Sequence, residues 1–319
     1  MTIRAVIFDI GGVVVGSPVA AIGEAEKRWS LPPHWINASI TAMGDDGPFQ
    51  RFERSEISQD EFYREFGARL SDVESGNKAY RVYCKRAGIE CPPLPTKVQI
   101  DGKELWGMMM APALEPDELV VTAINRLRAS RRYKVAALTN NFAPLGVTPS
   151  RSPPSPPYAR PTTAAELRAA LKATAEQGEE ATGAGNDAMR GMFDEYVESC
   201  VEGLRKPDPA FFRVALDRVG VEPHEAVFLD DIGHNLAAAR KLGMHTIRAF
   251  PLSHTLPCPH SADEVARAHR GQARQVARGN RRAREAARDG PLESARQAVD
   301  ASEVQVCASL EGFLTSLYP

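Results

Sequence analysis

The stretch that decides the fold is Ile7–Val13, whose sequence is IFDIGGV. It contains the end of a nearly continuous apolar run, Ile3–Phe8. Such a short run is typical of a strand buried on both faces of a parallel sheet. Asp9 follows the strand directly, and two glycines come soon after it. Because ligands of open α/β sheets bind where the strands end at their carboxyl edge, we expect Asp9 to lie in a functional site.

Further strands and helices alternate along the chain. Strands are predicted at Val135–Leu138, Ala226–Leu229 and His245–Phe250, with a weaker candidate at Tyr196–Cys200. Helices are predicted at Glu118–Arg128, Asp208–Gly220 and Asn235–Gly243, where Asp208 is the expected N-cap and glycines end the last two helices. This alternation predicts an α/β fold: a Rossmann-like parallel sheet with helices on both faces.

A helical insert is predicted after the first strand, over residues 17–111. Ser17-Pro18 is interpreted as a helix start, and Ser58–Glu61 as a capping box. An apolar stripe follows, and the three tryptophans are interpreted as packing residues, one of which could line a site entrance: Phe62, Phe66, Leu70, Val73, Trp29, Trp35 and Trp106. We expect this small helical cap to cover the carboxyl edge of a core formed by residues 1–16 and 112–252.

Two other segments are interpreted as additions to that core. The first spans about 143–190: a Pro- and Ser-rich linker at 144–161, then a capping box at Thr163–Glu166 that opens an Ala-rich helix. The second is a C-terminal extension, 253–319, expected to be partly disordered, with a last helix that could pack on the core. Its arginines between 267 and 288 fall near one helical face, which predicts a solvated surface helix or, alternatively, a site for an acidic partner or RNA.

The composition excludes several classes of protein. The net charge of −2 gives no reason to expect a nucleic acid partner. Five scattered cysteines do not form the pattern of a disulfide framework or a zinc site. No apolar run is long enough to span a membrane, and the early first strand leaves no room for a signal peptide, so we expect a cytoplasmic protein. The oligomeric state is left open.

Four motifs carry the candidate chemistry, and each lies at the end of a strand or before a helix. They are Asp9 with its glycines, LTNN at Leu138–Asn141, LRKPD at Leu204–Asp208, and FLDDIG at Phe228–Gly233 with Asn235 just beyond. Three carboxylates in one crevice require a cation, and Mg²⁺ is the usual hard cation that oxygen ligands hold. Lys206 and the Thr139 hydroxyl could bind a phosphate, which Asp9 is placed to attack.

The order of these motifs resembles the haloacid dehalogenase (HAD)-like hydrolase superfamily. FDIGGVV at Phe8–Val14, LTNN, VFLDDIGHN at Val227–Asn235 and FQRFERSEI at Phe49–Ile57 are most similar to the subgroup that contains the N-terminal phosphatase domain of soluble epoxide hydrolase. The likeness covers about residues 1–142 and 190–250.

The resemblance implies a Mg²⁺-dependent phosphatase that acts on a small phosphomonoester through an aspartyl-phosphate. Asp9 would be the nucleophile and a metal ligand, and Lys206 would stabilise the developing charge. Asp231 would be a direct ligand, with Asp230 acting through water. The remaining implied roles are metal binding by the Gly11 carbonyl, phosphate binding by Thr139 and Asn140, and support of the last motif by Asn235.

Gly11 departs from the family pattern. Phosphatases of this family usually carry a second Asp there, which protonates the leaving oxygen. General acid catalysis is typically worth about 10²–10⁴-fold, so esters with poor leaving groups should react slowly. The departure leaves two alternatives open: a catalytically weak member that binds a phosphorylated ligand or a protein partner, and a haloacid dehalogenase, whose halide needs no proton.

Overall fold

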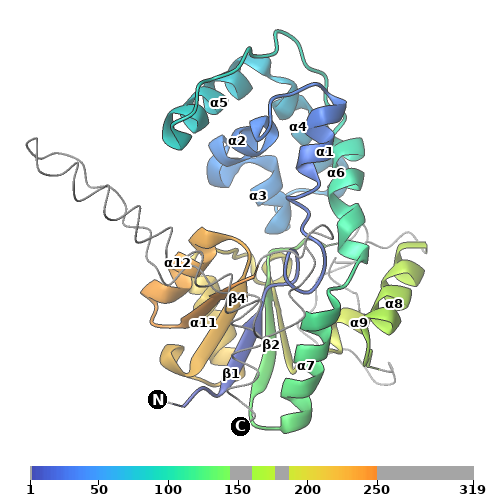
Figure 1. Cartoon of the computed structure of the whole chain (residues 1–319), viewed down its shortest axis with the longest axis vertical. Helices are drawn as coiled ribbons and strands as arrows, with labels where there is room; N and C mark the ends of the chain where they lie inside the picture. The colour runs from blue at the N-terminus through green and yellow to red at the C-terminus, as the bar shows by residue number, and fades with distance from the viewer. Residues whose placement is uncertain (1, 144–159, 177–186, 250–319) are drawn as a thin grey trace, which may run out of the picture. The chain divides into compact units, whose positions relative to one another are not determined.

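Five parallel strands form the sheet that organises the described part of the chain. The computed structural model describes residues 2–143, 160–176 and 187–249. The strand order is β3-β2-β1-β4-β5 (Figure 1). The strands are β1 (Ala5–Phe8), β2 (Lys134–Thr139), β3 (Glu195–Glu198), β4 (Ala226–Asp230) and β5 (His245–Arg248). A strand lies at each of the five predicted places, and β1 is at the centre; the weaker candidate at Tyr196–Cys200 is wrong at its end, because Ser199 and Cys200 begin the helix α10 (Ser199–Glu202).

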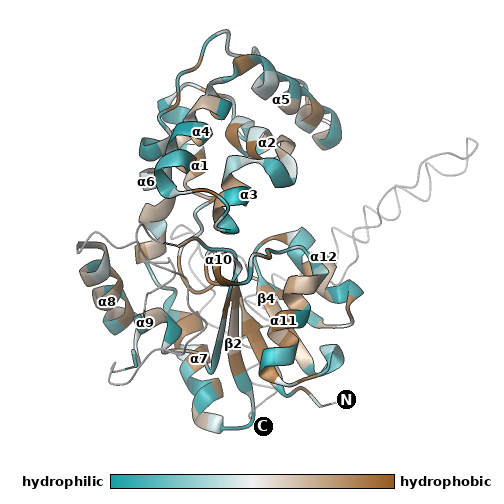
Figure 2. Cartoon of the chain, turned by 180° about the vertical axis from the view of Figure 1, so that it is seen from behind, coloured by the Kyte–Doolittle hydropathy of each residue, from teal (hydrophilic) through white to brown (hydrophobic). Residues whose placement is uncertain are grey.

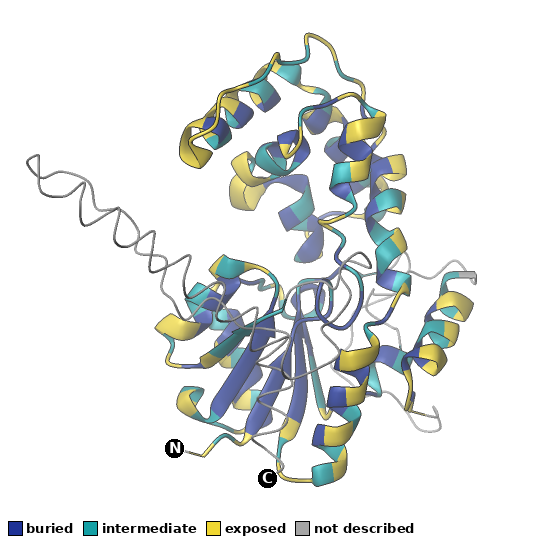
Figure 3. Ribbon diagram, viewed as in Figure 1, coloured by how far each residue is buried: buried dark blue, intermediate teal, exposed yellow. Residues whose placement is uncertain are grey.

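Both faces of the sheet are buried, which explains why its strands have apolar sequences. All four residues of β1 are fully buried, and β1, β2 and β4 are mostly dark blue in Figure 3. Ala5 and Ile7 of β1 pack in a cluster with Phe211 and Leu236 from two covering helices. Val6 and Phe8 alternate to the opposite face and are equally buried. The α/β architecture is thus as predicted.

The helices around the sheet are α7 (Glu118–Ser130), α8 (Ala164–Glu176), α9 (Asp187–Arg190), α10 (Ser199–Glu202), α11 (Pro209–Val219), the 3₁₀ turn η3 (Pro223–Glu225) and α12 (Gly233–Lys241). Helix α11 begins as expected: the Asp208 side chain accepts a hydrogen bond from Ala210 N, and Gly220 ends the helix at a φ of 75°. Helices α8 and α9 lie within the addition at 143–190. The predicted Arg-rich helix and last helix fall outside the described residues.

A second set of helices follows β1 and has a hydrophobic core of its own. It consists of α1 (Ile22–Arg28), α2 (Trp35–Ala42), η1 (Gly44–Asp46), α3 (Pro48–Glu53), α4 (Gln59–Ser71), α5 (Val73–Ala87), α6 (Gly102–Met110) and η2 (Ala111–Leu114). Phe62, Phe66 and Leu70 from the predicted stripe are buried in this core. The Ser58 side chain caps α4 by accepting a hydrogen bond from Glu61 N. In Figure 2, teal hydrophilic residues and brown hydrophobic residues are interspersed along these helices.

The prediction of a helix start at Ser17-Pro18 is wrong. Helix α1 begins only at Ile22, and Ser17 lies in the segment that leads from the sheet into these helices. The chain returns close to that segment at Pro112. A Cβ added to Gly16 would lie only 2.6 Å from the carbonyl oxygen of Pro112. Ser17 is buried, and its hydroxyl donates a hydrogen bond to the carboxylate of Asp231 instead of capping a helix.

Candidate active site

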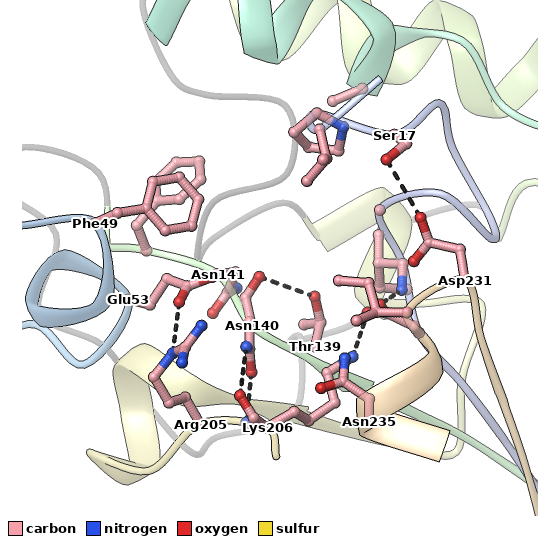
Figure 4. A pocket seen from close by; sticks show the side chains of 18 of the residues that line it. Ser17, Phe49, Glu53, Thr139, Asn140, Asn141, Arg205, Lys206, Asp231 and Asn235 are labelled. Carbon is pink, nitrogen blue, oxygen red and sulfur yellow. Dashed lines mark hydrogen bonds and ion pairs between the residues drawn. The ribbon is translucent and has the colours of Figure 1, made fainter. Parts of the chain in front are cut away.

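The four sequence motifs meet at the carboxyl edge of the sheet. Asp9 follows β1, Thr139 ends β2, Asp230 ends β4, and Lys206 lies in the loop before α11. A cavity of about 170 Å³ opens there (Figure 4). Seven of the eight predicted site residues line it: Asp9, Gly11, Thr139, Asn140, Lys206, Asp231 and Asn235. The eighth, Asp230, is fully buried behind Lys206.

Lys206 joins the carboxylates of two strands. Its Nζ lies 2.7 Å from Asp9 Oδ1 and 2.9 Å from Asp230 Oδ2, and all three side chains are buried. Burial raises the pKa of Asp9 well above its usual value, although Lys206 opposes that change. Burial alone would lower the pKa of Lys206, but Asp230 and Asp9 outweigh it and raise that pKa. The lysine therefore remains a cation at the base of the cavity.

Both oxygens of Asp230 accept hydrogen bonds. Besides Lys206, Asn235 Nδ2 lies 3.2 and 3.1 Å from the two carboxylate oxygens, and Ile232 N donates to Oδ1 at 2.7 Å. A carboxylate bonded in this way is held rigidly. Asn235 thus holds the carboxylate of Asp230, the first residue of the acidic motif.

Asp231 differs from Asp230, because one of its oxygens has no donor. Oδ2 accepts a hydrogen bond from Ser17 Oγ at 3.3 Å. Oδ1 is buried and has no hydrogen-bond partner among the described residues. Burial, together with the neighbouring Asp230, raises the pKa of Asp231 to about 6. A buried acceptor without a partner is costly unless a ligand satisfies it.

The three aspartates fit a hard divalent cation. Asp9, Asp230 and Asp231 each offer a carboxylate oxygen, and these atoms lie within 4.8 Å of one another. Ligands of this kind and spacing suit Mg²⁺, and the unpartnered Asp231 Oδ1 is the atom that such an ion would satisfy.

The glycines after Asp9 allow the loop to approach Asp231. Gly12 has a φ of 81°, and a Cβ on it would lie 2.2 Å from Asp231 Oδ2. Any other residue would be strained there and would displace the carboxylate. Gly11 is different: its φ is outside the left-handed region, and an added Cβ would meet only Pro18 Cδ, at 3.1 Å.

The side chain of Asn140 is already used within the protein. Its Oδ1 accepts a hydrogen bond from Lys206 N at 2.8 Å, and its Nδ2 donates to Lys206 O at 3.1 Å. The amide therefore clamps the backbone of the lysine loop against the end of β2. Thr139 also lines the cavity. Among the described residues, its hydroxyl makes only a long contact of 3.4 Å with Asn140 O.

Asn141 anchors the point where the addition at 143–190 leaves the sheet. Its Nδ2 donates to Glu198 Oε1 at 2.7 Å, and its backbone N donates to Ser199 Oγ at 2.9 Å. Arg190, at the end of the addition, forms an ion pair with the other oxygen of Glu198. These contacts keep the end of β2 in register with β3, so the addition leaves the predicted phosphate motif in place.

The sequence reasoning missed an ion pair in the cavity wall. Arg205 Nε donates to Glu53 Oε2 at 2.7 Å, which joins the loop before α11 to the end of α3. Burial raises the pKa of Glu53, and Arg205 opposes that change. Apolar side chains complete the wall: Phe49, Trp106, Met110, Ala113 and Phe142. Glu53 lies in the FQRFERSEI stretch. That stretch carried part of the family resemblance, but it did not predict the contact with Arg205.

Comparisons with known proteins agree with this arrangement. The family model described as haloacid dehalogenase-like hydrolase matches residues 3–243. Acyl-CoA dehydrogenase family member 10 of Mus musculus is 31% identical over 246 residues, which cover 77% of this chain and 18% of that protein. Bifunctional epoxide hydrolase 2 of Sus scrofa is 26% identical over 250 residues, with 77% and 36% covered. The chain therefore belongs to the haloacid dehalogenase-like hydrolases, and it spans only a minor part of these two relatives.

A solved structure of a HAD family enzyme from Bacteroides thetaiotaomicron is also similar, with a TM-score of 0.43 and 16% sequence identity over 80% of this chain and 97% of that one. The family membership confirms the resemblance read from the motifs and makes the chain a hydrolase. Among the described residues, no helix is both long and apolar enough to cross a membrane.

Proposed function

We propose that this hydrolase is a Mg²⁺-dependent phosphatase that acts on a small phosphomonoester. One observation carries the proposal: Asp9 is held by Lys206 beside Asp231, whose buried Oδ1 has no partner in the part of the chain that the structure describes. The arrangement offers a nucleophile, a cation for phosphate and a set of oxygen ligands in one cavity. Members of this family typically depend on Mg²⁺, and the helices α1–α6 would be its cap.

The metal would be held by Asp9, Asp231 and the backbone carbonyl of Gly11. Asp230 would contact the metal through a water molecule. When bound, Mg²⁺ would supply positive charge to the oxygens of the transferring phosphoryl group. Thr139 and the backbone N–H groups of its loop would hold those oxygens. Asn140 would act indirectly by fixing the loop of Lys206, because its side-chain amide is already engaged.

Asp9 would attack phosphorus through a carboxylate oxygen, and the bond from phosphorus to the ester oxygen would break. Lys206 would stabilise the charge that develops on the phosphoryl oxygens. The leaving oxygen would take its proton from water, since Gly11 offers no carboxyl group. Water would then cleave the aspartyl-phosphate, which releases phosphate and regenerates Asp9. Esters with acidic leaving groups should therefore react fastest.

The test is hydrolysis of p-nitrophenyl phosphate by the wild type and by Asp9→Asn, with Mg²⁺ or with a chelator. We expect turnover that needs both Asp9 and the metal, and a phosphoryl group on Asp9 in acid-quenched protein analysed by mass spectrometry. Asp60→Asn, which changes an exposed carboxylate on α4, is the matched control. Turnover that survives both the chelator and Asp9→Asn would refute the proposal.

A second candidate function is favoured by Gly11: binding of a phosphorylated ligand without appreciable turnover. In that case, phosphate and phosphonates would bind in the presence of Mg²⁺, while even aryl phosphates would remain intact. Release of chloride from 2-chloropropionate, measured in the same preparation, would instead indicate the dehalogenase alternative.

A further inference from the structure

The ion pair between Glu53 and Arg205 lies in the cavity wall but has no part in the proposed chemistry. Its members come from α3 and from the loop before α11, and they are 152 residues apart in the chain. The pair is well shielded, with 9% of the Glu53 side chain and 19% of the Arg205 side chain exposed. Both residues line the cavity that contains Asp9.

Arg205 retains hydrogen-bonding capacity toward that cavity. A guanidinium group carries five N–H donors, and Arg205 uses its Nε for Glu53. Within the described ranges, its two terminal nitrogens have no side-chain or backbone acceptor. Arg205 is seen below Glu53 and beside Asn140 and Lys206 in Figure 4. Because Arg205 and Lys206 line the same cavity, a ligand that binds with its phosphate near Lys206 can present a second polar group to Arg205.

The charges around the cavity decide what that group can be. Asp9, Asp230, Asp231 and Glu53 are acidic, whereas Lys206 and Arg205 are the basic residues that face them. A divalent cation would balance the remaining negative charge, and a phosphate dianion would restore an excess of it. Since Glu53 already neutralises Arg205, a second anionic group on the ligand would meet net repulsion in a poorly solvated site. An uncharged acceptor would meet only the free donors.

We propose that Arg205, whose charge is neutralised by Glu53, is a specificity-determining residue. It selects phosphomonoesters that carry an uncharged hydrogen-bond acceptor, such as a hydroxyl, ether or carbonyl group, over those that carry a second anionic group. The inference rests on the proposed function, because it takes the phosphate to bind beside Asp9 and Lys206. The apolar wall formed by Phe49, Trp106 and Phe142 suits an aromatic or aliphatic body between the two polar ends.

The test measures binding, so that it does not depend on turnover. Benzylphosphonate, 4-carbamoylbenzylphosphonate and 4-carboxybenzylphosphonate are titrated into the protein by calorimetry at pH 8 with Mg²⁺. We expect the wild type to bind the amide about tenfold more tightly than the carboxylate, because only the carboxylate meets the net repulsion of the site. In Glu53→Gln, Arg205 is unpaired, so the carboxylate should gain about tenfold and the preference should vanish or reverse.

A double variant and a control separate charge from folding. Glu53→Gln combined with Arg205→Gln removes both charges, so the amide should lose about tenfold while the carboxylate gains nothing. Glu56→Gln breaks the exposed pair with Arg54 nearby and should leave all three affinities unchanged. Equal amide-to-carboxylate ratios in the wild type and Glu53→Gln, with benzylphosphonate bound by both, would overturn this inference alone. Failure of benzylphosphonate to bind the wild type would overturn the proposed phosphate site as well.

Discussion

Lys206 Nζ lies between Asp9 Oδ1, at 2.7 Å, and Asp230 Oδ2, at 2.9 Å, with all three side chains buried. Removal of one partner from such a buried group leaves uncompensated charge, which typically costs about 3–5 kcal/mol. Lys206→Met should therefore lower both the stability and the rate, the latter by at least about 10²-fold. Chemical denaturation and p-nitrophenyl phosphate turnover measure the two effects. Lys241→Met, on α12, is the control, and an equal loss in both variants would contradict this role.

The two glycines after Asp9 should respond differently to the same substitution. Gly12→Ala would bring a Cβ to 2.2 Å from Asp231 Oδ2 at a positive φ, whereas Gly11→Ala meets only Pro18. We expect Gly12→Ala to weaken Mg²⁺ binding by about tenfold or more, since displacement of one charged ligand is worth over 1.4 kcal/mol. Gly11→Ala should change it little. Calorimetric titration of Mg²⁺ distinguishes them, and similar affinities would show that the close approach is unimportant.

Gly11→Asp should restore the missing proton donor. The rate for alkyl phosphates should rise by up to about 10²-fold relative to the rate for aryl phosphates. This is the smaller end of what general acid catalysis typically supplies. Pro18 Cδ must yield by a few tenths of an ångström, so Gly11→Asp with Pro18→Ala is the companion variant. The measurement is the dependence of rate on leaving-group pKa. If the wild type already shows a flat dependence, another residue donates the proton.

The stability of the metal-free protein should carry a pH dependence due to Glu53. Burial raises the pKa of Glu53 above 4.5, so the folded state holds this proton to higher pH than the unfolded state does. Its contribution to stability is therefore lost as the pH rises from about 4.5 through the raised pKa. Glu53→Gln lacks this titration. The free energy of unfolding of the wild type minus that of Glu53→Gln should fall over this window, and a difference that rises would contradict the shift.

The sequence predicted the position of a site residue correctly where that residue lies next to a strand or helix that the sequence also predicts. Asp9, Thr139 and Asp230 each follow or end an apolar strand, so the parallel sheet alone brings them to one edge. The same reasoning placed Lys206 in the cavity through the N-terminus of α11. These positions needed only local pattern and the rule that strands of such sheets run in one direction.

Contacts between distant segments could not be predicted in this way. The bond from Ser17 to Asp231 and the pair between Glu53 and Arg205 depend on how the helices α1–α6 meet the sheet edge. No periodicity encodes that arrangement. The engagement of Asn140 with the backbone of Lys206 was equally hidden, because an Asn beside Thr suggests a ligand contact and a structural clamp alike.

The hydrogen bonds at Glu198 bear on how well the chain tolerates insertions and deletions between residues 143 and 190. Asn141, before the addition at 143–190, and Arg190, at its end, both bind the carboxylate of Glu198. The entry and exit of the addition are thus tied to one buried residue of β3. Changes in length between these two anchors should therefore be absorbed without moving β2, and a foreign domain inserted between them should cost little in folding.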